Sequence, residues 1–365
     1  MKIEELNKET LKDLIRSEFG ITDAMEHPER FQEIGLDPRR IDEIQRKLLS
    51  SSLEVLSQEA EENELIRGCI GILGQCKVKD NKLHDNILDC LMKYMDQELM
   101  FSLEATHSFY KLAELVSPEA LERRIEHLVH LLEVGDEMAS WNGAYALAKL
   151  AAKVDKKSLQ AHISRVLNVV RLNTGFRKAH AISALAKLYH YADLKEEILD
   201  TLLLAAQDFD ENIRRASIFA LSDCISEGTK DKILNLFEEL LEDEVKTVKY
   251  GALEALTEVL PYKVSSEAFC SILEFLEADE PWVRWRVVLA INKAYSELDA
   301  SEKERAINAL SKVVQDGDIF VRVKTYEAFL NIRDLDKQDF PKIDEALKRE
   351  SDFVQRWVLY NFDQR

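Results

Sequence analysis

The sequence predicts an all-α fold, a right-handed α-solenoid of about nine helical hairpins with an N-terminal helical cap. The first observation is that turn-forming residues are scarce, with 11 Gly and 6 Pro in 365 residues. That composition argues against a β-sandwich, a collagen-like chain or a disordered tail. The second observation is an internal pattern that recurs every 33 to 38 residues over the C-terminal two thirds of the chain. Fixed periods of this size are typical of repeat arrays.

The N-terminal residues 1–45 do not follow the repeat and are expected to form a helical cap or docking element. Gly20, Pro28, Gly35 and Pro38 interrupt short helical stretches within them. A cap is expected because an open solenoid must shield its last apolar face from water. Residues 46–365 are then the repeat array.

The early hairpins are predicted from amphipathic stretches. Residues 41–56, 85–95 and 121–133 look like first helices of hairpins, and residues 65–76 and 102–115 look like their second helices. The two second helices fit the repeat pattern less well than later ones. Ser117 followed by Pro118 predicts a capped helix start.

The later hairpins share a column of small residues on their second helices. Three positions before each alanine of this column stands another small or β-branched residue, so both lie on one helical face, where a neighbouring helix can approach closely. First helices are predicted over residues 233–244, 268–280 and 304–318, and Ser301 with Glu304 form a possible capping box. The column consists of Ala146, Ala184, Ala220, Ala255, Ala290 and Ala328, preceded by Gly143, Ala181, Ser217, Ala252, Val287 and Thr325.

An acidic turn followed by an apolar–basic pair precedes four of these second helices. Two helices per unit, a period in the middle thirties and this turn signature resemble HEAT repeats, strongly over residues 130–365 and weakly over 50–130. The resemblance implies that the charged residues bridge one hairpin to the next as a structural ladder. Its members are Asp208, Arg214, Asp243, Lys249, Asp279, Arg284, Asp316 and Arg322.

Two features of the second helices point to a binding surface, because in HEAT arrays these helices line the concave side. One is a stripe of basic residues near the helix starts, and the other is a set of aromatic residues one turn apart. Trp, Tyr and Arg dominate binding hot spots, although solvated charges and packing between repeats remain competing interpretations. The candidate partner-binding residues are Trp141, Tyr145, Arg215, Phe219, Tyr250, Trp285, Arg286, Lys324 and Tyr326.

The sequence contains no motif for catalysis. It has no glycine-rich phosphate loop, HExxH zinc motif, GxSxG elbow or dinucleotide fingerprint. His127 and His130 lie three residues apart, but a surface pair without further ligands is the more common explanation. The HEAT-like deoxyhypusine hydroxylases use His-Glu dipeptides, which are absent here. We therefore expect no enzyme activity, no catalytic residues, no metal and no cofactor.

These features predict a non-catalytic scaffold or adaptor that binds a protein or peptide on its concave second-helix face. The formal net charge of −19 favours a basic partner and disfavours nucleic acid. One alternative is a nucleic-acid-binding protein that resembles the HEAT-like DNA alkylation-repair glycosylases and uses the basic inner stripe. A remote alternative is a protein similar to the HEAT-like phycobilin lyases.

The chain is expected to be cytoplasmic and not inserted in a membrane. No apolar run approaches the length that crosses a bilayer. The first ten residues carry acids where a signal peptide needs a basic start and an apolar stretch. Five cysteines without a CxxC pair indicate reduced thiols.

Overall fold

The computed structural model describes residues 2–17, 20–58, 62–97, 99–259, 265–336 and 340–363, and every regular element in these ranges is a helix. This confirms the predicted all-α solenoid. The chain divides into two compact units, residues 1–201 (unit 1) and 202–365 (unit 2). Within the described ranges the helices α3 to α20 form nine consecutive hairpins, as expected.

The N-terminal segment of unit 1 is built from short helices that pack on the first hairpin. Ile15, on α1, packs so closely on Gly68 that a Cβ added to Gly68 would lie 2.6 Å from the Ile15 Cγ2. The hydroxyl of Ser51 donates a hydrogen bond to the Leu6 carbonyl at 3.2 Å. The elements are α1 (Lys8–Arg16), α2 (Ile21–Glu26), two 3-10 helices (Pro28–Ile34 and Pro38–Arg40), α3 (Ile41–Ser57) and α4 (Asn63–Gly74). Because α3 begins at Ile41, the expected boundary after residue 45 falls inside a helix.

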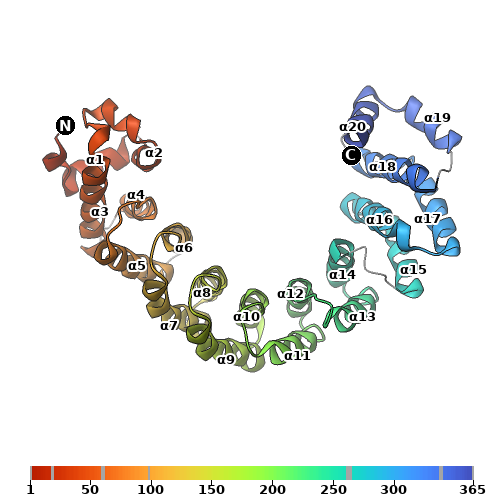
Figure 1. Cartoon of the computed structure of the whole chain (residues 1–365), viewed down its shortest axis with the longest axis horizontal. Coiled ribbons are helices and arrows are strands. Elements are labelled where there is room, and N and C mark those ends of the chain that lie inside the picture. The colour runs from red at the N-terminus through yellow and green to blue at the C-terminus, as the bar shows by residue number, and fades with distance from the viewer. Residues whose placement is uncertain are drawn as a thin grey trace. The chain divides into compact units, whose positions relative to one another are not determined.

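Unit 1 continues with three regular hairpins. In Figure 1 its second helices α4, α6, α8 and α10 lie in one row and its first helices in another. Helix α11 (Lys195–Ala205) begins in unit 1 and ends in unit 2. The other helices are α5 (Asn81–Met95), α6 (Leu99–Ala113), α7 (Pro118–Val134), α8 (Glu137–Leu150), α9 (Lys156–Leu172) and α10 (Gly175–Leu188).

Unit 2 repeats the same hairpin, with acidic turns between its first and second helices. Short 3-10 segments, Phe275–Glu277 and Tyr295–Glu297, extend α15 and α16. Its helices are α12 (Glu211–Ser222), α13 (Lys230–Leu240), α14 (Lys246–Val259), α15 (Ser266–Glu274), α16 (Pro281–Ala294), α17 (Ala300–Val313), α18 (Ile319–Asp336), α19 (Pro341–Arg349) and α20 (Asp352–Asp363).

The column of small residues lies where helices meet. All six alanines of the column are at most 3% exposed. The closest approach is at Gly143 on α8, where an added Cβ would lie 2.5 Å from the Leu128 carbonyl oxygen of α7 and 3.0 Å from the Leu131 Cβ. Only a residue without a side chain allows these two backbones to come so close.

One predicted helix start is correct and one is wrong. The Ser117 hydroxyl accepts a hydrogen bond from the Ala120 N–H at 3.4 Å, as a cap should. The capping box of α17 uses Asp299 and Glu302, not Ser301 and Glu304: the Glu302 N–H donates to Asp299 at 2.8 Å, and the Asp299 N–H donates back to Glu302 at 2.9 Å. Ser301 is already the second residue of the helix, so its hydroxyl lies past the capping position.

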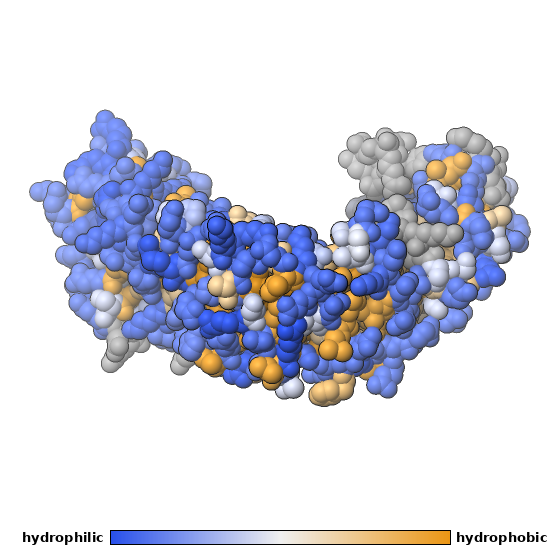
Figure 2. All heavy atoms as spheres, turned by 60° about the horizontal axis from the view of Figure 1, so that its bottom comes forward, coloured by the Kyte–Doolittle hydropathy of each residue, from blue (hydrophilic) through white to orange (hydrophobic). Residues whose placement is uncertain are grey.

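The face of the molecule drawn in Figure 2 is mainly hydrophilic, with hydrophobic residues visible among the hydrophilic ones. Of the helices that the structure describes, none is both long and apolar enough to cross a membrane.

Candidate functional site

A groove of about 480 Å³ lies between α8 and α10 on the second-helix side of unit 1. Its size is within the range of pockets that bind small ligands or single side chains of a partner. It is lined by Trp141, Ala144, Tyr145, Ala148, Lys149 and Ala152 from α8 and its end, and by His180, Ser183, Ala184 and Lys187 from α10.

One wall of the groove is an exposed aromatic pair. Trp141 and Tyr145 lie one helical turn apart, and their rings stack with centroids 5.1 Å apart and planes 12° from parallel. The two residues are 38% and 36% exposed. One turn further, the Lys149 ammonium lies 5.5 Å from the Tyr145 ring centroid and 5.2 Å from that of Tyr110. Stacking and cation–π contacts hold this wall in a defined conformation.

The floor and opposite wall of the groove leave room for an incoming side chain. Ala144 and Ala184 are buried at its base. His180 Nδ1 lies 3.1 Å from the Ser140 hydroxyl, and burial lowers the pKa of His180, so its imidazole is neutral at pH 7. The positive charge at the groove therefore comes from Lys149 and Lys187.

In unit 2, two of the predicted partner-binding aromatics are buried. Tyr250 is 7% exposed and Tyr326 only 2%. The Tyr250 hydroxyl donates to Glu280 at 2.7 Å, and its ring meets the Trp282 ring edge-on at 5.3 Å. The Tyr326 hydroxyl donates to Glu350 at 3.4 Å. Both side chains pack against the next hairpin, so the expectation that they form a contact surface is corrected.

The predicted basic stripe of unit 2 is largely paired with acids. Arg286 has a side chain only 13% exposed and forms ion pairs with Glu254 at 2.8 Å and Glu258 at 2.6 Å. Its guanidinium also covers the half-buried ring of Trp285 at 5.1 Å. Lys324 pairs with Glu327 at 2.8 Å. Intrahelical and inter-hairpin carboxylates neutralise these cations, which the sequence analysis had treated as available to a ligand.

Arg215 and Phe219 lie together on the exposed side of α12. The guanidinium of Arg215 stands 5.8 Å from the Phe219 ring centroid, and Phe219 is 40% exposed. Of the predicted contact residues in unit 2, this pair is the most accessible.

Arginines of the predicted ladder join a turn of unit 2 to the next turn wherever the ladder position is an arginine. Arg214 donates to the Asp243 carboxylate through Nε and Nη2, both at 2.8 Å, and to the Asp208 carbonyl of its own turn at 2.9 Å. Arg284 repeats the arrangement with Asp316, at 2.7 and 2.8 Å.

The carboxylates of this ladder are held charged. Burial alone would raise the pKa of Asp243, but hydrogen bonds from Arg214 and from the Val245 N–H outweigh burial and lower it. The pKa of Asp316 is lowered in the same way, against burial, by Arg284 and the Asp318 N–H. An arginine fork that meets both carboxylate oxygens is the strongest of these contacts.

Two residues of the predicted ladder are placed differently. The Asp279 carboxylate is 96% exposed and lies 3.6 Å from Lys246, and only the Asp279 carbonyl accepts from Arg284. Within the described residues Lys249 forms no hydrogen bond or ion pair, and its charge only helps to lower the pKa of Asp243. The reason is chemical: a lysine lacks the forked guanidinium that can reach the carbonyls of its own turn and the next carboxylate together. A third ladder residue, Arg322, donates to Glu350 at 2.7 Å, and Glu350 is not among the predicted ladder residues.

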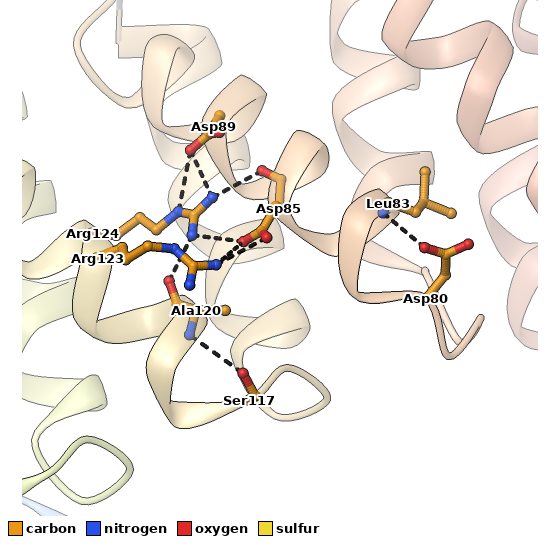
Figure 3. A network of polar contacts seen from close by, with 8 residues as sticks. All are labelled: Asp80, Leu83, Asp85, Asp89, Ser117, Ala120, Arg123 and Arg124. Atoms are coloured by element: carbon orange, nitrogen blue, oxygen red, sulfur yellow. Dashed lines mark hydrogen bonds and ion pairs between the residues drawn. The ribbon is translucent and has the colours of Figure 1, made fainter.

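Unit 1 contains a buried arginine network that the sequence analysis missed (Figure 3). Arg124 on α7 has a side chain 6% exposed and donates to Asp85 at 2.8 Å, to Asp89 at 2.8 Å and to the Ala120 carbonyl at 2.8 Å. Its neighbour Arg123 is 57% exposed and reaches only Asp85, at 2.7 Å. A sequence signal exists: two acids one turn apart on a first helix precede adjacent arginines on the next first helix.

Another arginine of unit 1 links neighbouring first helices in the same way as Arg124. Arg165 on α9 binds Glu126 at 2.6 Å and Glu133 at 2.5 Å on α7. The ladder arginines of unit 2 instead join neighbouring turns. Within the described ranges, no group of three or more His, Cys, Asp or Glu side chains is placed to hold a metal ion.

Comparisons with known proteins support the fold. No protein-family model matches the chain. No curated protein matches it either. Among solved structures, importin beta is similar with a TM-score of 0.60 and 12% identity, over 97% of this chain and 50% of that chain. Kap121p bound to Nup53p is similar with a TM-score of 0.54 and 15% identity, over 96% of this chain and 40% of that chain. Both are helical solenoids, so the likeness supports the architecture.

Proposed function

We propose that this chain is a non-catalytic HEAT-repeat scaffold that binds a protein or peptide partner on its second-helix face. The contact site is the groove between α8 and α10. The observation that carries the proposal is the stacked, exposed pair of Trp141 and Tyr145 beside an alanine floor. Large rigid aromatics next to a pocket are typical of the residues that dominate binding energy.

The groove favours a particular kind of partner segment. A large apolar side chain can enter above Ala144 and Ala184 and pack against the aromatic wall. Lys149 at the groove favours a carboxylate next to that side chain. A segment with an apolar anchor flanked by Asp or Glu therefore fits the groove best.

Nucleic acid fits the chain less well. The net charge is −19, and the ladder arginines of unit 2 together with Arg286 and Lys324 are paired with carboxylates. Nucleic-acid affinity depends on cations that neutralise phosphates. A protein partner is accordingly the function we propose, in the cytoplasm as the sequence predicts.

The test is affinity capture from the native lysate with the tagged chain and the double variant Trp141→Ala/Tyr145→Ala. Tyr191→Ala is the matched control, because Tyr191 is as exposed as Tyr145 and lies outside the groove. We expect a discrete protein that resists nuclease, binds the wild type and the control, and is lost from the double variant. Retention of that protein by the double variant, or recovery that depends on nucleic acid, would contradict the proposal.

A further inference from the structure

The turns of unit 2 carry a row of exposed aromatic side chains. Trp282, Phe320 and Phe353 occupy the same repeat position, directly before the first buried valine of each second helix, and are 40%, 56% and 53% exposed. Phe209, in the turn before α12, is 87% exposed but lies three residues before the equivalent position, which is Asn212 in that hairpin and Thr247 in the next. We call the four aromatic residues the turn row. Aromatics repeated at one position of successive hairpins are more than scattered exposed residues, and such patches typically mark interaction sites.

Ring contacts cover two members of the turn row in part. Phe353 has its ring centroid 5.7 Å from that of Trp357. Trp282 meets Tyr250 edge-on, with ring centroids 5.3 Å apart. Phe209 and Phe320 leave more than half of their surface in water. Exposing this much aromatic surface contributes nothing to the stability of the isolated chain.

The same turns are strongly acidic. The ladder arginines use one carboxylate on each of three turns, those of Asp243, Asp316 and Glu350. Among the other acids of these turns, Glu211, Glu242, Glu244 and Glu277 are exposed, and the Asp279 side chain is 96% exposed. Thirteen acidic and two basic residues stand in the segments 206–211, 241–247, 277–282, 314–320 and 349–353.

We propose that the turn row binds an extended polypeptide segment rich in Lys and Arg, with an apolar residue at every third position. The apolar residues pack on the aromatics and the basic residues meet the acids between them. Nucleic acid, an anionic membrane and a second copy of this acidic chain would all be repelled by the same surface. Only a basic polypeptide satisfies both the charge and the apolar row.

The spacing follows from helix packing. Helix α16 packs on α18, and α18 packs on α20. Neighbouring packed helices lie about 8–10 Å apart, so equivalent aromatics recur at about that interval. An extended polyproline-II segment rises about 3.1 Å per residue with three residues per turn, which puts every third side chain on one face about 9 Å apart. The interval between equivalent aromatic side chains therefore matches the interval between every third side chain of such a segment.

The proposal is tested with fluorescein-labelled peptides and the full chain. The probe has the repeating unit Leu-Lys-Lys, and a second peptide has the same composition with irregular leucine spacing. Fluorescence anisotropy at physiological salt measures both affinities. We expect the regular peptide to bind at least about threefold more tightly than the irregular one, since only the regular one can seat several leucines at once.

Two variants and one matched control separate the contribution of the turn row to peptide binding from that of the overall charge. Phe209→Ser/Phe320→Ser removes the most exposed aromatics. Neutralising turn acids with Glu244→Gln/Glu277→Gln/Asp279→Asn removes three charges. The control, Asp231→Asn/Glu267→Gln/Glu304→Gln, removes three exposed charges at the starts of first helices, away from the turns between the helices of each hairpin.

We expect both turn variants to weaken binding of the regular peptide by about tenfold, which corresponds to 1.4 kcal/mol. The control should stay within about twofold of the wild type. Circular dichroism verifies that all variants keep their helix content. Equal weakening by the two charge variants, unchanged binding by the aromatic variant, or equal affinity for both peptides would overturn the proposal. The turn row and the α8–α10 groove lie in different units. A negative result in this experiment therefore does not contradict the groove proposal, which has a separate test.

Discussion

The close approach of α7 and α8 predicts opposite effects for two chemically identical substitutions. At Gly143 an added Cβ meets backbone, 2.5 Å from the Leu128 carbonyl oxygen and 3.1 Å from the Leu132 nitrogen. At Gly251 on α14 the nearest atoms are side-chain ends, the Ile218 Cδ1 at 3.6 Å and the Arg215 Cγ at 3.7 Å. The first site is overpacked by a methyl group, and the second has ordinary van der Waals room.

The expected magnitudes follow from two terms. Replacing a helix-interior glycine with alanine stabilises the helix by about 1 kcal/mol. Overpacking a well-packed contact costs about 1–3 kcal/mol. At Gly143 both terms act and α7 must move, so the loss from overpacking is partly offset by the gain in helix propensity and the net loss is up to about 2 kcal/mol. At Gly251 only the first term acts, so we expect a gain of about 0.5–1 kcal/mol.

Hydrogen–deuterium exchange with mass spectrometry suits this prediction, because repeat arrays can unfold locally and a single melting temperature would average over both units. Peptides from α8 should exchange about tenfold faster in Gly143→Ala than in the wild type. Peptides from α14 should exchange more slowly in Gly251→Ala. Equal or slower exchange of α8 in Gly143→Ala would refute the argument that backbone proximity selects glycine there.

Three further predictions concern charges and caps. Arg124→Ala should lower the free energy of unfolding by about 2 kcal/mol, because it removes a buried guanidinium that hydrogen-bonds two aspartates. Arg123→Ala, on an exposed arginine, should cost less than about 1 kcal/mol. Urea unfolding compares the two variants, and similar losses would contradict the network of Figure 3. Asp299→Ala should cost about 1 kcal/mol and Ser301→Ala about zero, measured by hydrogen exchange of peptides from α17; the reverse order would contradict the observed cap. Asp243→Ala should cost about 3 kcal/mol at pH 7. Since the pKa of Asp243 is lowered in the folded chain, that difference should shrink only below about pH 4; a difference already lost at pH 6 would contradict the ion pair.

The repeat could be predicted from the sequence because its small-residue column is a packing requirement. Every alanine of the column ends up buried, and Gly143 sits where two backbones nearly touch. The turn arginines could also be predicted. A guanidinium at this fixed repeat position satisfies its hydrogen bonds in one geometry, with the carbonyls of its own turn and the carboxylate of the next. Lys249 departs from the pattern because its single ammonium group cannot reproduce that geometry.

The surface could be predicted only in part. Trp141 and Tyr145 occupy the same two repeat positions as Tyr250 and the largely buried Tyr326, yet the first pair is exposed and the others are covered. Their exposure depends on which side chain of the next hairpin covers the site, Glu280 in the case of Tyr250. A pattern within one repeat does not contain that information, because it depends on the register between repeats.

The α8–α10 groove is tested most directly by site-specific photo-crosslinking in the native cell. A benzophenone amino acid at Ala152, an exposed residue at the end of the groove, would react with whatever lies in it. The same amino acid at Tyr191, outside the groove, is the control. We expect one discrete protein adduct from position 152 and none of that adduct from position 191. An adduct with nucleic acid, the same adduct from both positions, or none from position 152 in the folded chain would contradict it.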